Sequence, residues 1–191
     1  CYLMKKYLLF IFILVLQYQL NAENRYWVAN SLANWSSNNW SNSPTGNPDG
    51  LGAPTATQRA VFNNNHLGTC RLDQLVTIES ISIDASFVGT IDFNSFSMNI
   101  VGSNDNYFYN GSLIDASNNS QLNINSSGRL FCSNVEISIP MDVICGNLYL
   151  NGSTYNKACT FNKTGPGNDF GNGGNIFNDY LTLINSGSGY L

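Results

Sequence analysis

Short stretches of alternating apolar and polar residues recur along this chain, and each ends in a polar turn. The clearest copies begin at Met98, Leu122, Leu148 and Leu181. Alternation with a period of two is typical of a strand that has one buried face. The intervals between the copies fall within the period of about 20–50 residues that is typical of repeat proteins whose coils stack on one another.

The alternation also predicts which residues face the interior of the stack. We expect one interior wall that is built from the apolar members of these copies: Met98, Ile100, Leu122, Ile124, Leu148 and Leu150. The residues between them, such as Asn99, Asn123 and Tyr149, are expected to face outward. At Glu79 and Ser80 the alternation slips by one position, which indicates a corner where the chain bends from one strand into the next.

These patterns predict an all-β protein, and specifically a right-handed parallel β-helix, or β-solenoid. Asn and Gly are frequent between the strands, and both residues tolerate the left-handed backbone conformations that tight turns require. A β-sandwich of the immunoglobulin or jelly-roll type is the alternative, because short alternating strands suit both architectures. The recurrence of one strand-and-turn unit favours the solenoid.

Residues 1–22 consist of three leader residues and, from Met4 onward, a segment with the pattern of a secretory signal peptide. Lys5 and Lys6 precede an apolar run over residues 7–16, and a polar stretch closes with Ala22. The apolar run is too short to cross a bilayer comfortably, and its flanking charges suit a cleaved signal. We therefore expect cleavage after Ala22, a secreted or outer cell-surface location, and no membrane span in the mature chain.

All three tryptophans lie close together in the sequence, at Trp27, Trp35 and Trp40. The exposed end of a solenoid must be covered, and an aromatic cluster buries much apolar surface per residue. We therefore assign residues 23–62 to a Trp-rich N-terminal cap with a loop, and residues 63–191 to the solenoid repeats. Flat aromatic rings also stack on sugar rings, so the three tryptophans are candidates for a glycan-binding site.

The tryptophans also carry a family resemblance. Three tryptophan-centred segments precede a Gly/Pro-rich loop and a short apolar strand: Tyr26-Trp27-Val28, Asn34-Trp35-Ser36, Asn39-Trp40-Ser41 and Ala60-Val61-Phe62. This arrangement resembles the N-terminal part of large secreted, adhesin-like β-solenoid repeat proteins of Bacteroidetes. Similarity of pattern continues through residues 69–83 and 173–189.

The resemblance implies a structural or adhesive module, secreted or displayed on the cell surface, that contacts glycans or other cell-surface and matrix components. The C-terminal sorting domain common in such proteins has no counterpart in this sequence. The chain also stops at Leu191, directly after a repeat turn. We therefore expect an N-terminal fragment of a longer repeat protein.

Composition and charge narrow the possible partners. Only 10% of the residues are charged and the formal net charge is -4, so the sequence gives no basic footprint for nucleic acid. The single histidine, His66, has no carboxylate or cysteine near it in the sequence that would complete a metal site or a catalytic base. No cofactor is predicted.

Candidate catalytic acids are few. Parallel β-helix enzymes that act on polysaccharides need several acids, or acids with bases, on neighbouring coils. The acids with suggestive spacing are Asp84, Asp92 and Asp115, and each follows an apolar strand residue, where a turn or outward carboxylate is expected anyway. We therefore predict a non-catalytic protein. The alternative is a carbohydrate-active β-helix enzyme whose catalytic coils lie beyond Leu191.

The part of the chain after Ala22 contains four cysteines: Cys70, Cys132, Cys145 and Cys159. Three disulfide pairings are possible, and thiols that are buried among apolar strand residues are at least as good an interpretation. Further along, the glycine-rich stretch 165–174 predicts a loop that projects from one coil. Asp169 and Asp179 in the region from Gly165 to Asp179 could hold calcium, although the calcium-binding nonapeptide motif is not matched.

Overall fold

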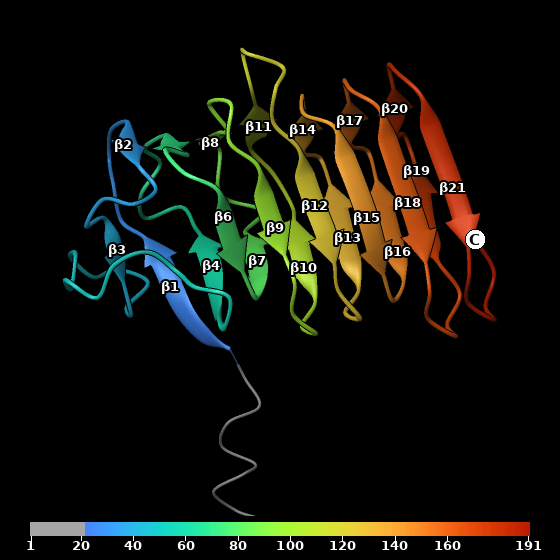
Figure 1. Cartoon of the computed structure of the whole chain (residues 1–191), viewed down its shortest axis with the longest axis horizontal. Coiled ribbons are helices and arrows are strands. Elements are labelled where there is room, and N and C mark those ends of the chain that lie inside the picture. The colour runs from blue at the N-terminus through green and yellow to red at the C-terminus, as the bar shows by residue number, and fades with distance from the viewer. Residues whose placement is uncertain (1–21) are drawn as a thin grey trace, which may run out of the picture.

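A computed structural model describes residues 22–191. The signal peptide predicted over residues 1–22 therefore lies outside the described residues, except for its last residue, Ala22. The described chain is a parallel β-solenoid of about six coils. Its described residues form 21 short strands and no helix. Figure 1 shows the strands stacked side by side along the long axis of the molecule, from β2 and β3 at one end to β21 at the other. The predicted solenoid is therefore confirmed.

Each full coil contributes one strand to each of three sheets, which we call sheets A, B and C. Sheet A consists of β1 (Glu23–Trp27), β3 (Trp40–Ser41), β4 (Gln58–Phe62), β7 (Ser80–Ile83), β10 (Asn106–Phe108), β13 (Leu130–Ser133), β16 (Leu148–Asn151) and β19 (Phe170–Gly173). Sheet B consists of β2 (Ala33–Asn34), β5 (Cys70–Arg71), β8 (Thr90–Asp92), β11 (Ser112–Ile114), β14 (Glu136–Ile137), β17 (Thr154–Tyr155) and β20 (Ile176–Phe177). Sheet C consists of β6 (Val76–Ile78), β9 (Met98–Ile100), β12 (Leu122–Asn125), β15 (Met141–Cys145), β18 (Cys159–Lys163) and β21 (Leu181–Asn185).

The true repeat is shorter than the sequence spacing predicts. Every step between neighbouring strands of sheet C is shorter than the step from Leu122 to Leu148 or from Leu148 to Leu181. The copies at 98, 122 and 181 do belong to sheet C, but the copy at Leu148 belongs to sheet A. The prediction of one wall was wrong because every full coil contains three strands with the same alternation. In sheet C, the coils of β15 and β18 lie between the copy at Leu122 and the copy at Leu181, and the predicted spacing missed both of them.

The interior of the stack is filled by the inward-facing residues of all three sheets. Five of the six predicted wall residues are buried, and the sixth, Leu150, is partly buried and packs against the core. Asn99, Asn123 and Tyr149 occupy half-buried outward positions, as predicted. The predicted corner is also confirmed, since Glu79 separates β6 of sheet C from β7 of sheet A.

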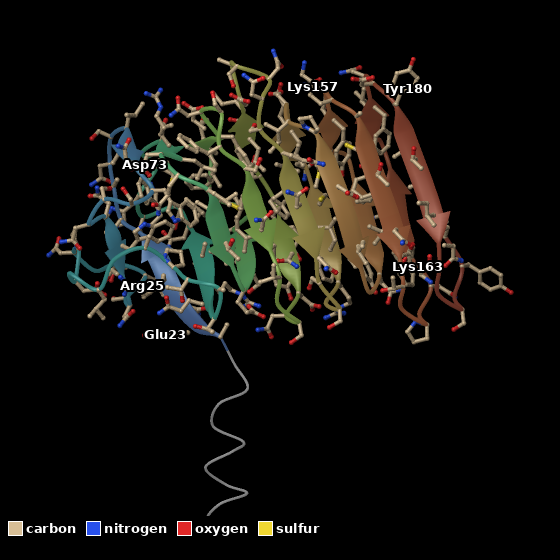
Figure 2. All side chains as sticks on the ribbon, viewed as in Figure 1. Glu23, Arg25, Asp73, Lys157, Lys163 and Tyr180 are labelled. Carbon is tan, nitrogen blue, oxygen red and sulfur yellow. The ribbon has the colours of Figure 1, made fainter. Side chains whose placement is uncertain are left out.

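At the N-terminal end, sheet A runs through the segment that the sequence assigns to the cap. β1 pairs in parallel with β4, and β3 folds back to pair antiparallel with β1. Sheet A therefore begins within residues 23–62, because the Trp-rich segment itself supplies its first strands. Arg25 of β1 lies at this end of the stack, and Tyr180 lies at the opposite end (Figure 2).

The glycine-rich stretch does not form one projecting loop. Residues 170–173 are strand β19, which pairs with β16 and continues sheet A. The residues before β19 connect it to β18, and Gly174 begins the connection to β20. The prediction was wrong for residues 170–173 because a strand at the edge of the stack needs no buried alternation, and its four residues are all exposed.

Candidate functional site

The three tryptophans lie in one buried cluster with Phe62. Trp27, Trp35 and Trp40 are at most 1% exposed, and the ring centroid of Trp40 lies 4.7 Å from that of Trp35 and 5.2 Å from that of Trp27. Two of the indole N–H groups donate hydrogen bonds within the protein. Trp27 Nε1 donates to the carbonyl of Gly68 and Trp40 Nε1 donates to that of Trp35, both at 2.9 Å. These rings form the core of the first coil and have no free face for a sugar.

One tryptophan does reach a surface groove. Trp35 lines a groove of about 470 Å³ together with residues 53–56 and 74–77. Trp35 is only 1% exposed, so it offers the groove no flat platform.

A row of aromatic side chains lies on the outer face of sheet A. From β1 to β19 the neighbouring strands of this sheet pair in parallel, so one residue from each strand falls into a single column along the solenoid. From the N-terminal end, the column is Tyr26, Val61, Ser82, Tyr107, Phe131, Tyr149 and Phe170. Its last four members are aromatic and come from four successive strands, and we call these four residues the aromatic ladder.

The rings of the aromatic ladder stack face to face. Successive ring centroids are 5.0, 4.4 and 5.6 Å apart, with interplanar angles of 21°, 19° and 13°. Tyr109 lies beside the ladder, 5.5 Å from Tyr107 between ring centroids. The ladder residues are half-buried except Phe170, which is 65% exposed.

A charged pair borders the ladder at the corner between sheets C and A. Asp105 accepts hydrogen bonds from the backbone N–H of Arg129 at 2.8 Å, from Arg129 Nε at 2.9 Å and from the Tyr107 hydroxyl at 3.2 Å. The Arg129 guanidinium also lies over the ladder, 5.1 Å from the ring centroid of Phe131 and 6.0 Å from that of Tyr149. A cation in this position is attracted by the negative faces of the rings.

This pair fixes the charge state of the border. Burial opposes ionisation of Asp105, but the hydrogen bonds from Arg129 outweigh it and hold the pKa of the carboxyl below its usual value. Burial, reinforced by the Asp105 charge, raises the pKa of Tyr107. At neutral pH the border therefore presents a carboxylate, a guanidinium and a neutral phenol.

What the ladder offers a ligand follows from its stacking. The ring faces cover one another, so the outer surface consists of ring edges, the hydroxyls of Tyr107 and Tyr149, and the exposed half of the Arg129 guanidinium. This combination of apolar edges with hydrogen-bonding groups repeats along the solenoid at the strand spacing, about 4.8 Å. A repeating surface of this kind suits a polymer that lies along the solenoid axis.

The outer face of sheet C differs sharply from that of sheet A. Its matching outward column contains only polar residues: Thr77, Asn99, Asn123, Asp142, Thr160 and Thr182. Asn123 donates to Asn99 across the coils at 3.0 Å, so these amides partly satisfy one another. The column of stacked aromatic rings is thus a feature of sheet A.

The candidate catalytic acids are placed at coil corners and bind turn groups. Asp115 accepts hydrogen bonds from Ser95, Ser117, Asn119 and Ser120. Burial opposes its ionisation, but the bonds from Ser117 and Ser120 outweigh this effect and hold the pKa of Asp115 well below the usual range.

The other two acids have different partners. Asp92 forms an ion pair with Arg71 at 2.8 Å, a basic partner from the preceding coil that the sequence did not reveal. Asp84 is near Ser82, and burial raises its pKa. Asp84 follows a strand of sheet A whereas the other two lie at sheet B, so the three acids do not share one face.

The cysteines are also accounted for. Cys70, Cys132, Cys145 and Cys159 are all buried free thiols, and burial raises the pKa of the last three to about 12. None of the three possible disulfide pairings is formed among these four residues.

The residues considered for metal binding have local partners. In the proposed calcium region, Asp169 accepts from the backbone N–H of Leu148 and Asp179 from that of Tyr180. Among residues 22–191, no cluster of three or more His, Cys, Asp or Glu side chains could hold a metal ion. His66 contacts Asn30.

Sequence reasoning missed the aromatic ladder. Its members are unevenly spaced in the sequence, so no fixed period reveals them, and Phe170 lies in the predicted loop. The signal that could have found them is an aromatic residue at the second or first position of every sheet A strand from β10 onward. Using it requires the strands to be assigned to sheets first.

Comparison of the chain with protein-family profiles, with curated proteins and with solved structures gave no match. Within the described residues, no helix has the length and apolar character that crossing a bilayer demands.

Proposed function

We propose that this protein is a secreted or cell-surface structural module that binds glycans or other surface polymers through the outer face of sheet A. The observation that carries the proposal is the aromatic ladder with its Arg129 and Asp105 border. Aromatic rings that remain half-exposed in a contiguous strip are a feature of interaction sites, because water solvates them poorly.

The chemistry of the strip favours carbohydrate over an apolar partner. Tyr107 and Tyr149 provide hydroxyls beside the apolar ring edges, and Arg129 and Asp105 provide a donor and an acceptor at the border. Sugar rings have the same mixture of C–H surface and hydroxyl groups. The ladder and its border can contact both the C–H surface and the hydroxyl groups of a sugar. Good binding sites likewise combine apolar surface with a small number of placed polar groups.

The secreted location rests on the predicted signal peptide, and the adhesive role rests on the resemblance to adhesin-like proteins. The secreted location and the adhesive role are both consistent with the low content of charged residues and the regular outer surface of the solenoid. Binding without catalysis is favoured because Asp92 and Asp115, two of the three candidate acids, are engaged in ion pairing or turn capping. A catalytic acid and base need freedom to exchange protons with a substrate.

The proposal is tested by removing ladder rings and measuring polysaccharide binding. The probes are soluble xylan, pectin and alginate in affinity electrophoresis, and cellulose and chitin in pull-down assays. Replacing Phe131 and Tyr149 with Ala, singly and together, should weaken binding about tenfold, because each change removes apolar contact area worth about 1.5 kcal/mol or more. Thr160→Ala on the outer face of sheet C is the matched control and should bind like the wild type.

Thermal unfolding of each variant shows whether the fold is retained. Loss of binding in a folded Tyr149→Ala variant supports the proposal. If the wild type binds a polysaccharide and both ladder variants bind it equally well, sheet A is not the binding face. If no probe binds, the partner is not a glycan of these classes, and the glycan-binding part of the proposal is wrong.

A further inference from the structure

The corner between β10 and β11 contains an Asn-Gly pair in an unusual arrangement. The backbone N–H of Gly111 donates to Asn110 Oδ1 of the preceding residue at 2.8 Å. Asn110 Nδ2 donates to the carbonyl of Ala85 at 3.0 Å on the preceding coil. The side-chain amide is thus held at both ends, with its carbonyl group against the next backbone nitrogen.

From this geometry we propose that Asn110 is a site of spontaneous deamidation. The reacting atoms are the backbone nitrogen of Gly111 and the side-chain carbonyl carbon of Asn110, and the hydrogen bond between the two residues brings the nitrogen next to that carbonyl. Reactions within a chain are accelerated when the reacting atoms are held about 3–3.5 Å apart. Asn110 and Gly111 are both half-buried, so water can reach the pair.

The reaction is a cyclisation followed by hydrolysis. Solvent hydroxide removes the proton from the Gly111 nitrogen, which then attacks the side-chain carbonyl carbon of Asn110 and forms a new C–N bond. The bond to the side-chain nitrogen breaks, and this nitrogen takes up a proton and leaves as ammonia. Water then adds to one of the two carbonyls of the resulting succinimide and opens it to aspartate or isoaspartate. No oxidant or reductant is involved.

The Gly111 nitrogen is available for this reaction because its hydrogen bond goes to the neighbouring side chain and not to another coil. The corner places its left-handed residue at Gly111, with φ of 79°. A Cβ at this position would meet the carbonyl oxygen of Gly89 at 2.9 Å, so a glycine is also required by the close approach of the preceding coil. Glycine in turn leaves the attacking nitrogen without a side chain that would obstruct it.

The chain contains a matched comparison in the same corner two coils later. Asn151, Gly152 and Ser153 repeat the sequence of Asn110, Gly111 and Ser112, so local sequence alone gives the two sites equal reactivity. There, however, Gly152 N–H donates to the carbonyl of Gly173 at 3.0 Å, and Asn151 Oδ1 accepts from Asn172 N–H at 2.6 Å. Both reacting groups of this second pair are held by the following coil.

The two sites differ because the chain is shifted by one position at the corner. Asn151 is the last residue of β16, whereas Asn110 lies beyond the end of β10. The asparagine that is still in the strand pairs with its neighbouring strand, and the one that is already in the turn contacts its own backbone. Selectivity between the sites therefore comes from the fold.

The test follows both asparagines in one sample. The folded protein is held at mildly alkaline pH and physiological temperature, and peptides from a time series are analysed by mass spectrometry for conversion of amide to acid. Isoaspartate is measured separately by enzymatic methylation. Asn110 should convert about tenfold faster than Asn151, since only Asn110 is held close to its attacking nitrogen. Equal rates, or a faster rate at Asn151, would overturn the proposal.

Two controls separate geometry from sequence. In concentrated denaturant the two sites should convert at similar rates, and a persistent preference for Asn110 there would show that the fold does not cause it. Asn110→Gln lengthens the side chain by one methylene, so cyclisation would have to form a less favourable six-membered ring in place of the five-membered succinimide, and the substituted amide should stay unconverted in the folded protein. Conversion of the introduced glutamine at the original rate would exclude the cyclisation.

Discussion

A single buried arginine ties the N-terminal end of the solenoid together. The Arg25 side chain is 1% exposed and forms a two-pronged ion pair with Asp49, in which Nη1 and Nη2 donate at 2.7 and 2.8 Å. Arg25 Nη2 also donates to the carbonyl of Gly52 at 2.6 Å. These bonds attach the loop that follows β3 to β1. A charge in this position is tolerated because both terminal nitrogens of the guanidinium have acceptors, one of which is a carboxylate.

We predict that this pair makes stability depend on pH in the acid range. The hydrogen bond from Arg25 holds the pKa of Asp49 well below its usual range. A carboxyl with a lowered folded-state pKa contributes stability above its unfolded pKa of about 3.9, and the contribution is lost as the pH falls towards the folded value. The unfolding temperature of the wild type should therefore drop steeply below about pH 4.

The Asp49→Asn variant isolates this contribution. It should be less stable than the wild type at neutral pH and should lose part of the acid dependence, so the two curves converge as the pH falls. Asp142→Asn, at an exposed position on sheet C, is the matched control and should follow the wild-type curve. Parallel curves for Asp49→Asn and the wild type would contradict the role of this pair.

At this scale, the sequence predicted which residues alternate but not what they contact. Asn99 and Asn123 were placed correctly because alternation alone decides their direction. Arg25 could not be predicted to be buried, because its partner Asp49 lies far along the chain in a loop without periodicity. Nor could the tryptophans be separated into cap and binding residues, since burial depends on which strands cover them.

At the scale of the elements, the corners between sheets C and A depend on a column of glycines. A Cβ on Gly128, Gly146, Gly165 or Gly187 would lie between 2.1 and 2.6 Å from a backbone oxygen of the preceding coil. None of the four has a positive φ, so close approach of the coils, and not a left-handed conformation, requires glycine here.

Replacing one member of this column should destabilise the whole stack. In Gly146→Ala, the new methyl group would lie 2.6 Å from the carbonyl oxygen of Ser127, so the coils must separate locally. We expect a loss of about 1–3 kcal/mol in the free energy of unfolding, which is typical of overpacking, measured by urea denaturation. Gly167→Ala is the control, because the atom nearest to the new methyl group would be the side-chain oxygen of Asn147, at the longer distance of 3.1 Å, and not a backbone atom. Equal stability of the two variants would show that the corner is less tightly packed.

The elements also show why sheet assignment could not be predicted. Strand existence was predictable over much of the chain, because alternating residues such as Val76 and Ile78 give a clear period of two. Strand membership was not, because all three sheets bury the same kinds of residue. The aromatic ladder depends on sheet membership, so it became visible only when β10, β13, β16 and β19 were seen to be neighbours.

At the scale of the whole molecule, the two ends of the stack are covered differently. At the N-terminal end, β3 pairs with β1 and the buried tryptophan cluster fills the first coil. At the other end, β19, β20 and β21 are the outermost strands of their sheets in the described chain. This last coil contains exposed apolar side chains, including Leu183 at 49% and Ile176 at 53%.

This difference predicts a gradient of local stability along the solenoid. Each coil of a solenoid is stabilised mainly by its nearest neighbours, so a strand with one neighbour opens more easily than a strand with two. Amide hydrogen exchange, measured by mass spectrometry on a folded polypeptide of residues 22–191, should be fastest in β19 and β21 and slowest in β15. A difference of about 1.4 kcal/mol in opening free energy would appear as a tenfold difference in exchange rate.

The first strand of the stack is the internal control for this gradient. β3 and β4 flank β1 on both sides, so β1 should exchange slowly although it lies near the other end of the solenoid. Fast exchange in β1 would mean that distance from an end, and not the number of paired neighbours, sets local stability. Uniform exchange across all coils would mean that the stack opens as one cooperative unit, and the nearest-neighbour account would then be wrong.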